Sequence, residues 1–304
     1  MKAAASIVLI CAYALSGCAT FSRLAQTQDT VSKFDQGVHL VSVSEMAFLH
    51  QIQAAECTRD FYAQAYAFAT ARRNPKTRSY PQVALNLEPH CVPKELTNGE
   101  LKLRQKLINV LTLYADSLEA LTNRQNNGGL DSKSSTLAKG FQSLASQQQF
   151  DAVSANATAG LNAAMVEVVE FIIDRREYTN IRQVASKLQK PLETIIDALK
   201  SENVNDAQGL ASKLETVTNE FRIAAVSSRD KRGPASFFDI TEAHAALMAI
   251  MITRPNVARL NEALDAVVAA NKALGNPKSV GAIPEIAAFV RRGQETAALF
   301  RSSK

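Results

Sequence analysis

Apolar side chains recur along the chain with the spacing of helix faces. They fall at steps of four and three in three stretches: Leu107, Leu111, Tyr114, Leu118 and Leu121; Leu210, Leu214, Val217, Phe221 and Ala224; and Val257, Leu260, Leu264, Val267 and Leu274. Asn271 puts one polar group on the last stripe. Such spacing is typical of amphipathic helices, and no segment alternates with period two. The pattern predicts an all-α protein.

Capping and turn signals mark where helices begin and end. Residues 97–100 read Thr-Asn-Gly-Glu, a capping box, and residues 126–129 read Asn-Asn-Gly-Gly, a turn. Gly275 is placed to end a helix. Pro255 lacks a backbone donor and is expected to end or kink its helix, whereas Pro191 is expected only to bend one, because the apolar stripe continues past it.

The pattern predicts an antiparallel multi-helix bundle of about eight or nine helices, either elongated or two-lobed. Short connections between most helices favour antiparallel neighbours. A polar, Gly-Pro-marked connection near 227–237 is the candidate lobe boundary. The expected helices cover 31–73, 97–124, 131–150, 156–178, 180–201, 205–229, 238–253, 256–275 and 282–302.

The N-terminus carries a different pattern. Lys2 precedes an apolar run over residues 3–14, shorter than the roughly 20 residues that a spanning helix needs. The run ends in Leu15-Ser16-Gly17-Cys18, which resembles the lipobox of bacterial lipoproteins. The alternatives are an ordinary secretory signal and a cytoplasmic protein with an apolar start.

The resemblance implies that residues 1–17 are a cleaved signal peptide and that Cys18 is lipidated. Two or three acyl chains anchor a protein almost permanently, because each buried methylene contributes about 0.8 kcal/mol. Ala19 in place of aspartate implies export to the outer membrane, facing the periplasm, with the periplasmic face of the inner membrane as the alternative. Residues 18–30 would be a short tether and 31–304 the helical domain.

Removal of the signal leaves Cys57 and Cys91 as the other two cysteines of the mature chain. In an oxidising compartment they are expected to form a disulfide, worth about 3 to 4 kcal/mol for a loop of this length. Two buried free thiols or a metal site remain alternatives, although neither cysteine has a CxxC partner.

Residues 72–93 depart most from the helical pattern, because they hold four of the nine prolines. This segment is a candidate partner-binding or headgroup-binding loop with five contact residues: Arg72, Arg73, Lys76, Arg78 and Tyr80. The alternative is a crossover whose arginines cap a helix and meet water. The formal net charge of only +5 gives no support for a nucleic-acid partner.

Several familiar metal, nucleotide and hydrolase motifs are absent from the sequence: it contains no ExxH, HExxH, GxSxG, P-loop or GxGxxG. His39 and His50 could share one helix face and hold a metal, but surface histidines are the favoured interpretation. We therefore expect a non-catalytic envelope lipoprotein that binds another envelope macromolecule, as a scaffold, an assembly factor or an immunity protein. The alternatives are a helical carrier for a hydrophobic ligand and, less favoured, a cell-wall hydrolase.

Overall fold

Helix accounts for nearly all of the chain that the computed structural model describes, which is residues 27–53, 98–122, 160, 163–168, 170–171, 181–228, 235–276 and 282–301. Within these ranges only Leu188 and Asn276 are not helical, and there is no strand. The predicted all-α class is confirmed.

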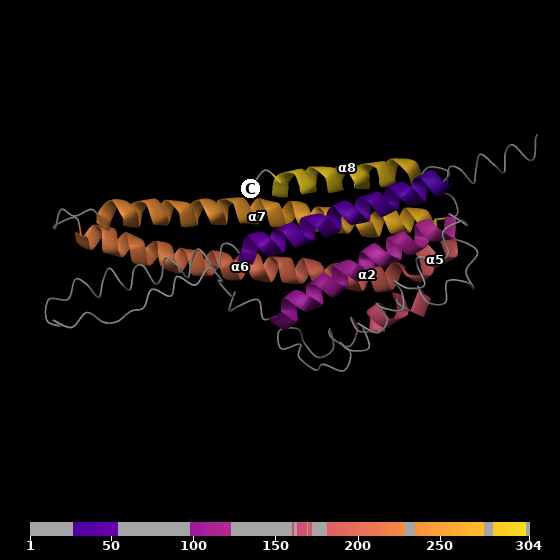
Figure 1. The fold of residues 1–304 in the computed structure, drawn as a ribbon, viewed down its shortest axis with the longest axis horizontal. Helices are drawn as coiled ribbons and strands as arrows, with labels where there is room; N and C mark the ends of the chain where they lie inside the picture. The colour runs from indigo at the N-terminus through magenta and orange to yellow at the C-terminus, as the bar shows by residue number, and fades with distance from the viewer. Residues whose placement is uncertain are drawn as a thin grey trace, which may run out of the picture.

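Seven helical segments lie in the described ranges. They are helix 27–53, α2 (Asn98–Thr122), the interrupted stretch 163–171, α5 (Ile181–Lys187), α6 (Gln189–Ser228), α7 (Ala235–Gly275) and α8 (Ala282–Arg301). The long helices α6 and α7 lie side by side, and α8 runs along the C-terminal part of α7 (Figure 1). The expected count of eight or nine was too high for this part of the chain. Two expected breaks, at 201–205 and 253–256, are absent because α6 and α7 run through them, whereas the expected helix 180–201 is interrupted at Leu188; the expected helix 131–150 lies outside the described residues.

The predicted break between residues 201 and 205 is wrong, because α6 passes through it. Asn203 favours a break on its own, since an asparagine side chain competes for nearby backbone groups. In the structure its amide is buried and donates to Glu45 at 2.7 Å instead. A tertiary contact therefore removes the local reason for the helix to end.

The expectation that Pro255 ends its helix is wrong, because α7 continues from Ala235 to Gly275 with the proline inside it; the alternative, a kink at Pro255, stays a prediction. The proline is exposed, so its ring faces solvent. The residues after it carry the predicted stripe, and every member is buried: Val257, Leu260, Leu264, Val267, Asn271 and Leu274. Packing of this stripe offsets the hydrogen bond that proline removes.

The stretch in which Pro191 was expected only to bend the helix is interrupted three residues earlier, at Leu188, between α5 and α6. Hydrogen bonds from the Leu188 amide to the Val184 carbonyl (2.9 Å) and from the Leu192 amide to the Leu188 carbonyl (3.0 Å) carry the helical ladder across it. Pro191 cannot donate to the carbonyl of Lys187, four residues earlier, so the ladder is missing one bond there. The proline interrupts the helix without ending it, as predicted.

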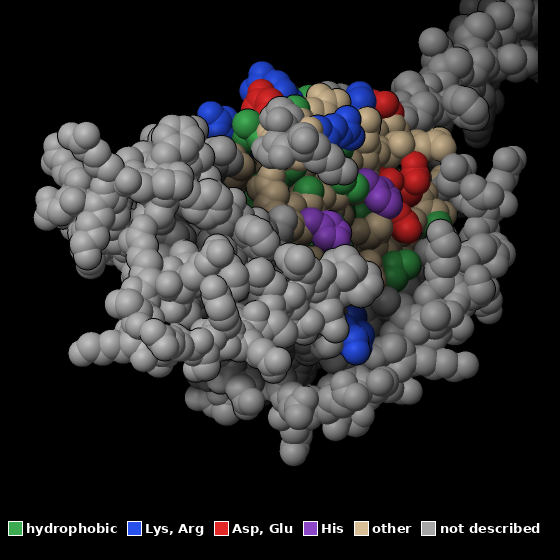
Figure 2. All heavy atoms as spheres, turned by 60° about the vertical axis from the view of Figure 1, so that its left-hand side comes forward, with side chains coloured by type: hydrophobic (Ala, Val, Ile, Leu, Met, Phe, Trp, Pro, Cys, Tyr) green, Lys and Arg blue, Asp and Glu red, His purple; other side chains and the backbone are tan. Residues whose placement is uncertain are grey.

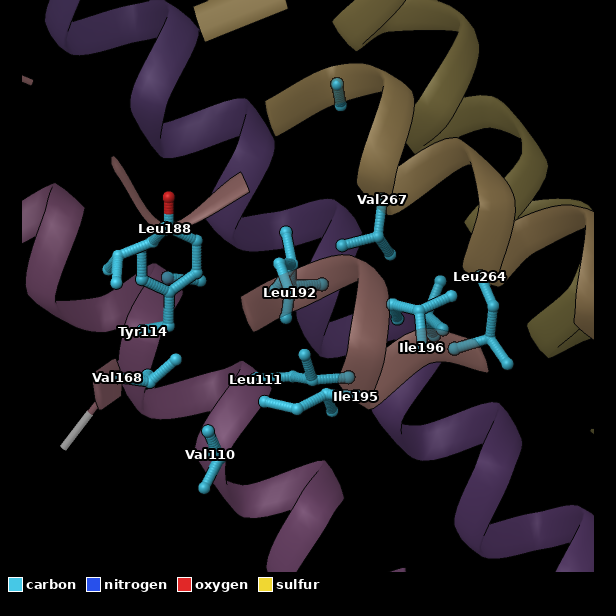
Figure 3. Packing of buried hydrophobic residues seen from close by; sticks show 14 of the residues in the cluster. Val110, Leu111, Tyr114, Val168, Leu188, Leu192, Ile195, Ile196, Leu264 and Val267 are labelled. Carbon is cyan, nitrogen blue, oxygen red and sulfur yellow. The ribbon is translucent and has the colours of Figure 1, made fainter. Parts of the chain in front are cut away.

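The main core joins all of these helices. The predicted stripe of α2 faces inward, with Leu107, Leu111, Tyr114 and Leu118 buried. Figure 3 shows side chains of α2 meeting those of α6 and α7, including Ile195 and Val267. Phe34 of helix 27–53 packs against Tyr114 and against Phe289 of α8, with ring centroids 6.2 and 5.8 Å apart.

Candidate functional site

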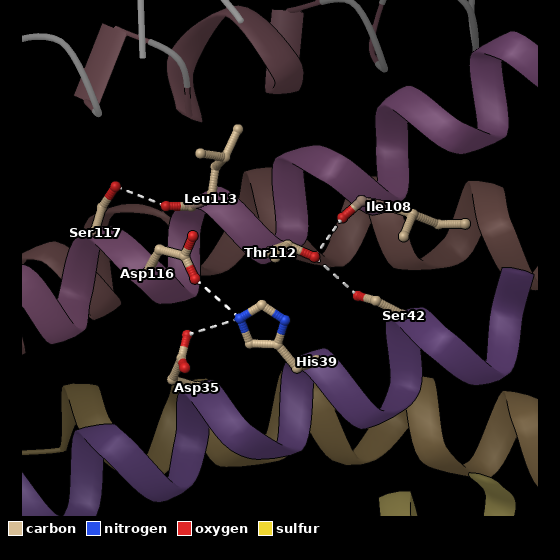
Figure 4. A network of polar contacts seen from close by, with 8 residues as sticks. All are labelled: Asp35, His39, Ser42, Ile108, Thr112, Leu113, Asp116 and Ser117. Atoms are coloured by element: carbon tan, nitrogen blue, oxygen red, sulfur yellow. Dashed lines mark hydrogen bonds and ion pairs between the residues drawn. The ribbon is translucent and has the colours of Figure 1, made fainter. Parts of the chain in front are cut away.

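Three potential ligand side chains meet where helix 27–53 lies against α2 (Figure 4). Asp35 and His39 are one turn apart on helix 27–53, so they share a face, and Asp116 reaches them from α2. The His39 Nε2 atom lies 3.0 Å from Asp116 Oδ1 and 3.7 Å from Asp35 Oδ1. We call these three residues the acid–histidine cluster.

The electrostatics of the cluster centre on Asp35. Its side chain is only 14% exposed, whereas that of His39 is 48% exposed. Burial raises the pKa of Asp35 to about 7; His39 lowers that pKa, and the neighbouring Asp116 and Glu119 carboxylates raise it. The Asp35 carboxyl can therefore hold a proton near neutral pH, and the cluster offers oxygen and nitrogen atoms to a cation. Because the His39 side chain is half exposed, the cluster is accessible from solvent. Figure 2 shows histidine and acidic side chains beside one another on this face.

A hydroxyl pair continues the polar contact between the same two helices. Ser42 and Thr112 share a hydrogen bond of 3.0 Å, and the Thr112 hydroxyl donates to the Ile108 carbonyl at 3.1 Å. His39 contacts Asp116, and Ser42, later on the same helix, contacts Thr112, which is earlier on α2. Residue numbers rise along helix 27–53 as they fall along α2. Helix 27–53 and α2 are therefore antiparallel here.

A second set of polar side chains is more deeply buried than the acid–histidine cluster and lies between helix 27–53, α2 and α6. Arg104 is 1% exposed, and its guanidinium contacts Asp206 at 2.7 Å and Glu202 at 3.3 Å. Asn203 bonds to Glu45, as described above. We call these five residues the buried charge layer.

Glu45 is the most perturbed carboxyl of this layer. Burial raises its pKa to about 7, a rise that the Asn203 hydrogen bond and the Arg104 charge oppose and that Asp206 assists. Its Oε2 atom, the Arg104 Nε atom and the Asn203 Oδ1 atom are buried and have no hydrogen-bond partner among the described residues. The layer is therefore costly to bury, because unsatisfied polar atoms lose their hydration without compensation.

Most residues predicted as functional lie outside the described part of the chain. This applies to the lipid-attachment residue Cys18, to the cysteines Cys57 and Cys91, and to the whole candidate contact loop, which comprises Arg72, Arg73, Lys76, Arg78 and Tyr80. His90 lies outside it too, and the side chain of His244 is not described.

The structure separates the two histidines that were considered as a pair. His39 and His50 lie on the same continuous helix, eleven residues and therefore about 16 Å apart along its axis. One ion cannot bind both side chains. His39 instead has Asp35 and Asp116 as neighbours. The Asp35-to-His39 spacing was a signal that the sequence offered, whereas the approach of Asp116 depends on tertiary packing.

Comparison with protein-family models, with curated proteins and with solved structures found no match to this chain. Among the helices that the structure describes, none combines the length and the apolar character that crossing a membrane requires. The case for function therefore depends on the residues of this chain alone.

Proposed function

We propose that the protein is a lipid-anchored envelope protein that acts by binding another envelope macromolecule and has no catalytic step of its own. The observation that carries the proposal is the stretch Leu15-Ser16-Gly17-Cys18 at the end of a short apolar run. Its cysteine would carry the lipid, at the outer membrane and facing the periplasm. The body would be an antiparallel helical bundle held near that surface.

The distance from the anchor to the body supports this proposal. The chain is helical from residue 27 at the latest, so at most eight residues separate Cys18 from a helix. Fully extended, that connection reaches about 30 Å. The body would stay close to the lipid headgroups, where a scaffold, an assembly factor or an immunity protein meets its partner.

The lipid anchor can be tested with two matched cysteine variants. Cys11 lies in the same N-terminal segment as Cys18, seven residues earlier. We expect Cys18→Ala to abolish incorporation of labelled palmitate and to release the protein from the membrane fraction, while Cys11→Ala changes neither. The anchor proposal fails if Cys18→Ala still partitions with membranes. Fractionation of the inner and outer membranes then shows which of the two contains the wild-type protein; we expect the outer membrane.

The binding role needs a direct search for the partner. We expect in-cell crosslinking of the full-length protein, followed by mass spectrometry, to recover one dominant envelope protein. Replacing Arg72, Arg73, Lys76 and Arg78 by glutamate should weaken that crosslink if the 72–93 loop forms the contact. The matched control replaces Arg291 and Arg292, which are exposed on α8, by glutamate. Recovery of no partner contradicts the binding role. If both variants weaken the crosslink equally, the 72–93 loop is not the specific contact surface.

The two remaining cysteines provide a test of compartment. In an oxidising periplasm we propose that Cys57 and Cys91 form a disulfide. Peptide mapping under non-reducing conditions should recover the two cysteines in one linked peptide pair. Recovery of both as free thiols from envelope preparations would contradict the disulfide.

A further inference from the structure

We propose that the acid–histidine cluster binds a divalent transition-metal ion, and that Zn²⁺ suits its donor atoms best. One imidazole nitrogen and two carboxylate oxygens, from His39, Asp35 and Asp116, lie within 4.8 Å of one another. The inference is independent of the lipid anchor and of the protein partner.

The spacing of the donor atoms is close to what one ion requires. A tetrahedral Zn²⁺ with bonds of about 2.0–2.2 Å holds neighbouring ligand atoms about 3.3–3.5 Å apart. The distances from His39 Nε2 to Asp116 Oδ1 and to Asp35 Oδ1, 3.0 and 3.7 Å, lie on either side of that range. Small side-chain rotations, without movement of either helix, would bring the three atoms around one ion.

An unsatisfied oxygen at the centre of the cluster points to a cation. Asp35 Oδ1 is buried and accepts no hydrogen bond from the residues that the structure describes, although it is the Asp35 atom that faces the His39 ring. A buried acceptor without a donor loses its hydration and gains nothing in return. A metal ion bound to this oxygen would compensate for that loss.

The donor types and their surroundings select the class of ion. Imidazole together with carboxylate favours zinc and other first-row transition metals, whereas calcium and magnesium prefer oxygen ligands alone. His39 is half exposed, so an ion can enter from solvent. Water or the Glu119 carboxylate, one turn beyond Asp116 on α2, would complete the coordination. The ion would join helix 27–53 to α2.

Binding can be measured on the full-length protein in detergent, after chelator treatment and alkylation of its thiols. We expect Zn²⁺ titrated calorimetrically to bind with one-to-one stoichiometry and a Kd of about 1–100 µM. His39→Ala and Asp116→Asn should each weaken binding by about tenfold or more. The matched control is His50→Ala, since His50 is an exposed histidine on the same helix. That variant should bind as the wild type does.

A second measurement needs no variant and so does not depend on whether a variant folds. Zn²⁺ should protect His39, but not His50, from acylation by diethyl pyrocarbonate, read by peptide mass mapping. Absence of one-to-one binding overturns the proposal. Equal weakening by His39→Ala and His50→Ala, or equal protection of the two histidines, also overturns it.

Discussion

Tyr114 on α2 and Asn271 on α7 are joined by a buried hydrogen bond across 157 residues of sequence, with the tyrosine hydroxyl donating to the asparagine oxygen at 2.5 Å. The Asn271 amide donates in turn to the Ala185 carbonyl at 2.9 Å and to Gln189 Oε1 at 2.8 Å. Burial raises the pKa of Tyr114, so the hydroxyl stays protonated and remains a donor. This contact ties α2, α5, α6 and α7 together.

Tyr114→Phe should lower the free energy of unfolding by about 1–3 kcal/mol, because it leaves the buried Asn271 oxygen without its donor. The ring contacts of Tyr114 with Phe34 and Phe171 would persist. Urea denaturation followed by circular dichroism measures the loss. In a double-mutant cycle with Asn271→Leu, the two losses should not add, since each removes the same hydrogen bond. Fully additive losses would show that the two residues act separately.

The sequence predicted the apolar stripes of α2 and of the C-terminal part of α7 well, because helical spacing is a local property; the side chains of the third stripe, Leu210 to Ala224, are not described. Leu107 to Leu118 on α2 and Val257 to Leu274 on α7 are buried as predicted. Asn271 was visible as a polar interruption of its stripe. Its partner Tyr114 was read only as another apolar member of the α2 stripe, since nothing local links two residues 157 positions apart.

The helix boundaries that were predicted wrongly have the same cause, because each depends on tertiary contacts that the local sequence does not reveal. A helix break was expected between residues 201 and 205, but Asn203 in that stretch has a buried partner for its amide in Glu45, 158 residues earlier. Pro255 looked like a helix end until packing of the following stripe outweighed its lost hydrogen bond. The acid–histidine cluster could be half predicted, because the spacing of Asp35 and His39 is local, whereas the approach of Asp116 is tertiary.

Gly37→Ala should destabilise the protein by about 1–3 kcal/mol, because the added methyl overpacks the contact between helix 27–53 and α8. A Cβ built at Gly37 would lie only 2.7 and 2.8 Å from two atoms of the buried Phe289 ring, and closer still to a third. Thermal unfolding measures the loss.

The matched control is Gly209→Ala, within helix α6. Apart from the neighbouring backbone of α6, no atom of the described residues lies within 4 Å of a Cβ at that position, so the better helix propensity of alanine should stabilise the protein by up to about 1 kcal/mol. Opposite signs for the two substitutions are the expected result. Stabilisation by Gly37→Ala would contradict the close packing of Phe289.

Arg104→Met should cost roughly 2–4 kcal/mol, because it leaves the Glu202 and Asp206 carboxylates without their cation in a largely buried setting. Lys33→Met is the matched control. The Lys33–Asp29 pair has the same 2.7 Å separation as Arg104–Asp206, but its side chains are 43% and 56% exposed. Removal of that pair should change the free energy of unfolding by less than about 0.5 kcal/mol. Equal losses in denaturant titrations would mean that burial does not decide the strength of these pairs.

Glu45→Gln should stabilise the protein at alkaline pH and have little effect in acid. The pKa of the Glu45 carboxyl is raised from 4.5 to about 7 on folding, so the folded state binds the proton more tightly than the unfolded state does. Below about pH 4.5 the carboxyl is neutral in both states and costs nothing. Between about pH 4.5 and 7 the carboxyl ionises in the unfolded chain but stays protonated in the folded protein, so the stability falls by on the order of 3 kcal/mol and is constant above that range. Glutamine stays neutral and avoids this loss.

Other carboxyl groups, including Asp35, titrate over the same range, so the informative quantity is the difference between the unfolding free energies of Glu45→Gln and wild type at each pH. That difference should grow between about pH 4.5 and 7 and then level off. The Arg104, Asp206 and Asn203 groups around Glu45 are common to both proteins, so their effects on the difference are indirect. A difference that stays constant from pH 4 to 8 would show that Glu45 ionises as easily in the folded protein as in the unfolded chain, and that the buried charge layer admits solvent.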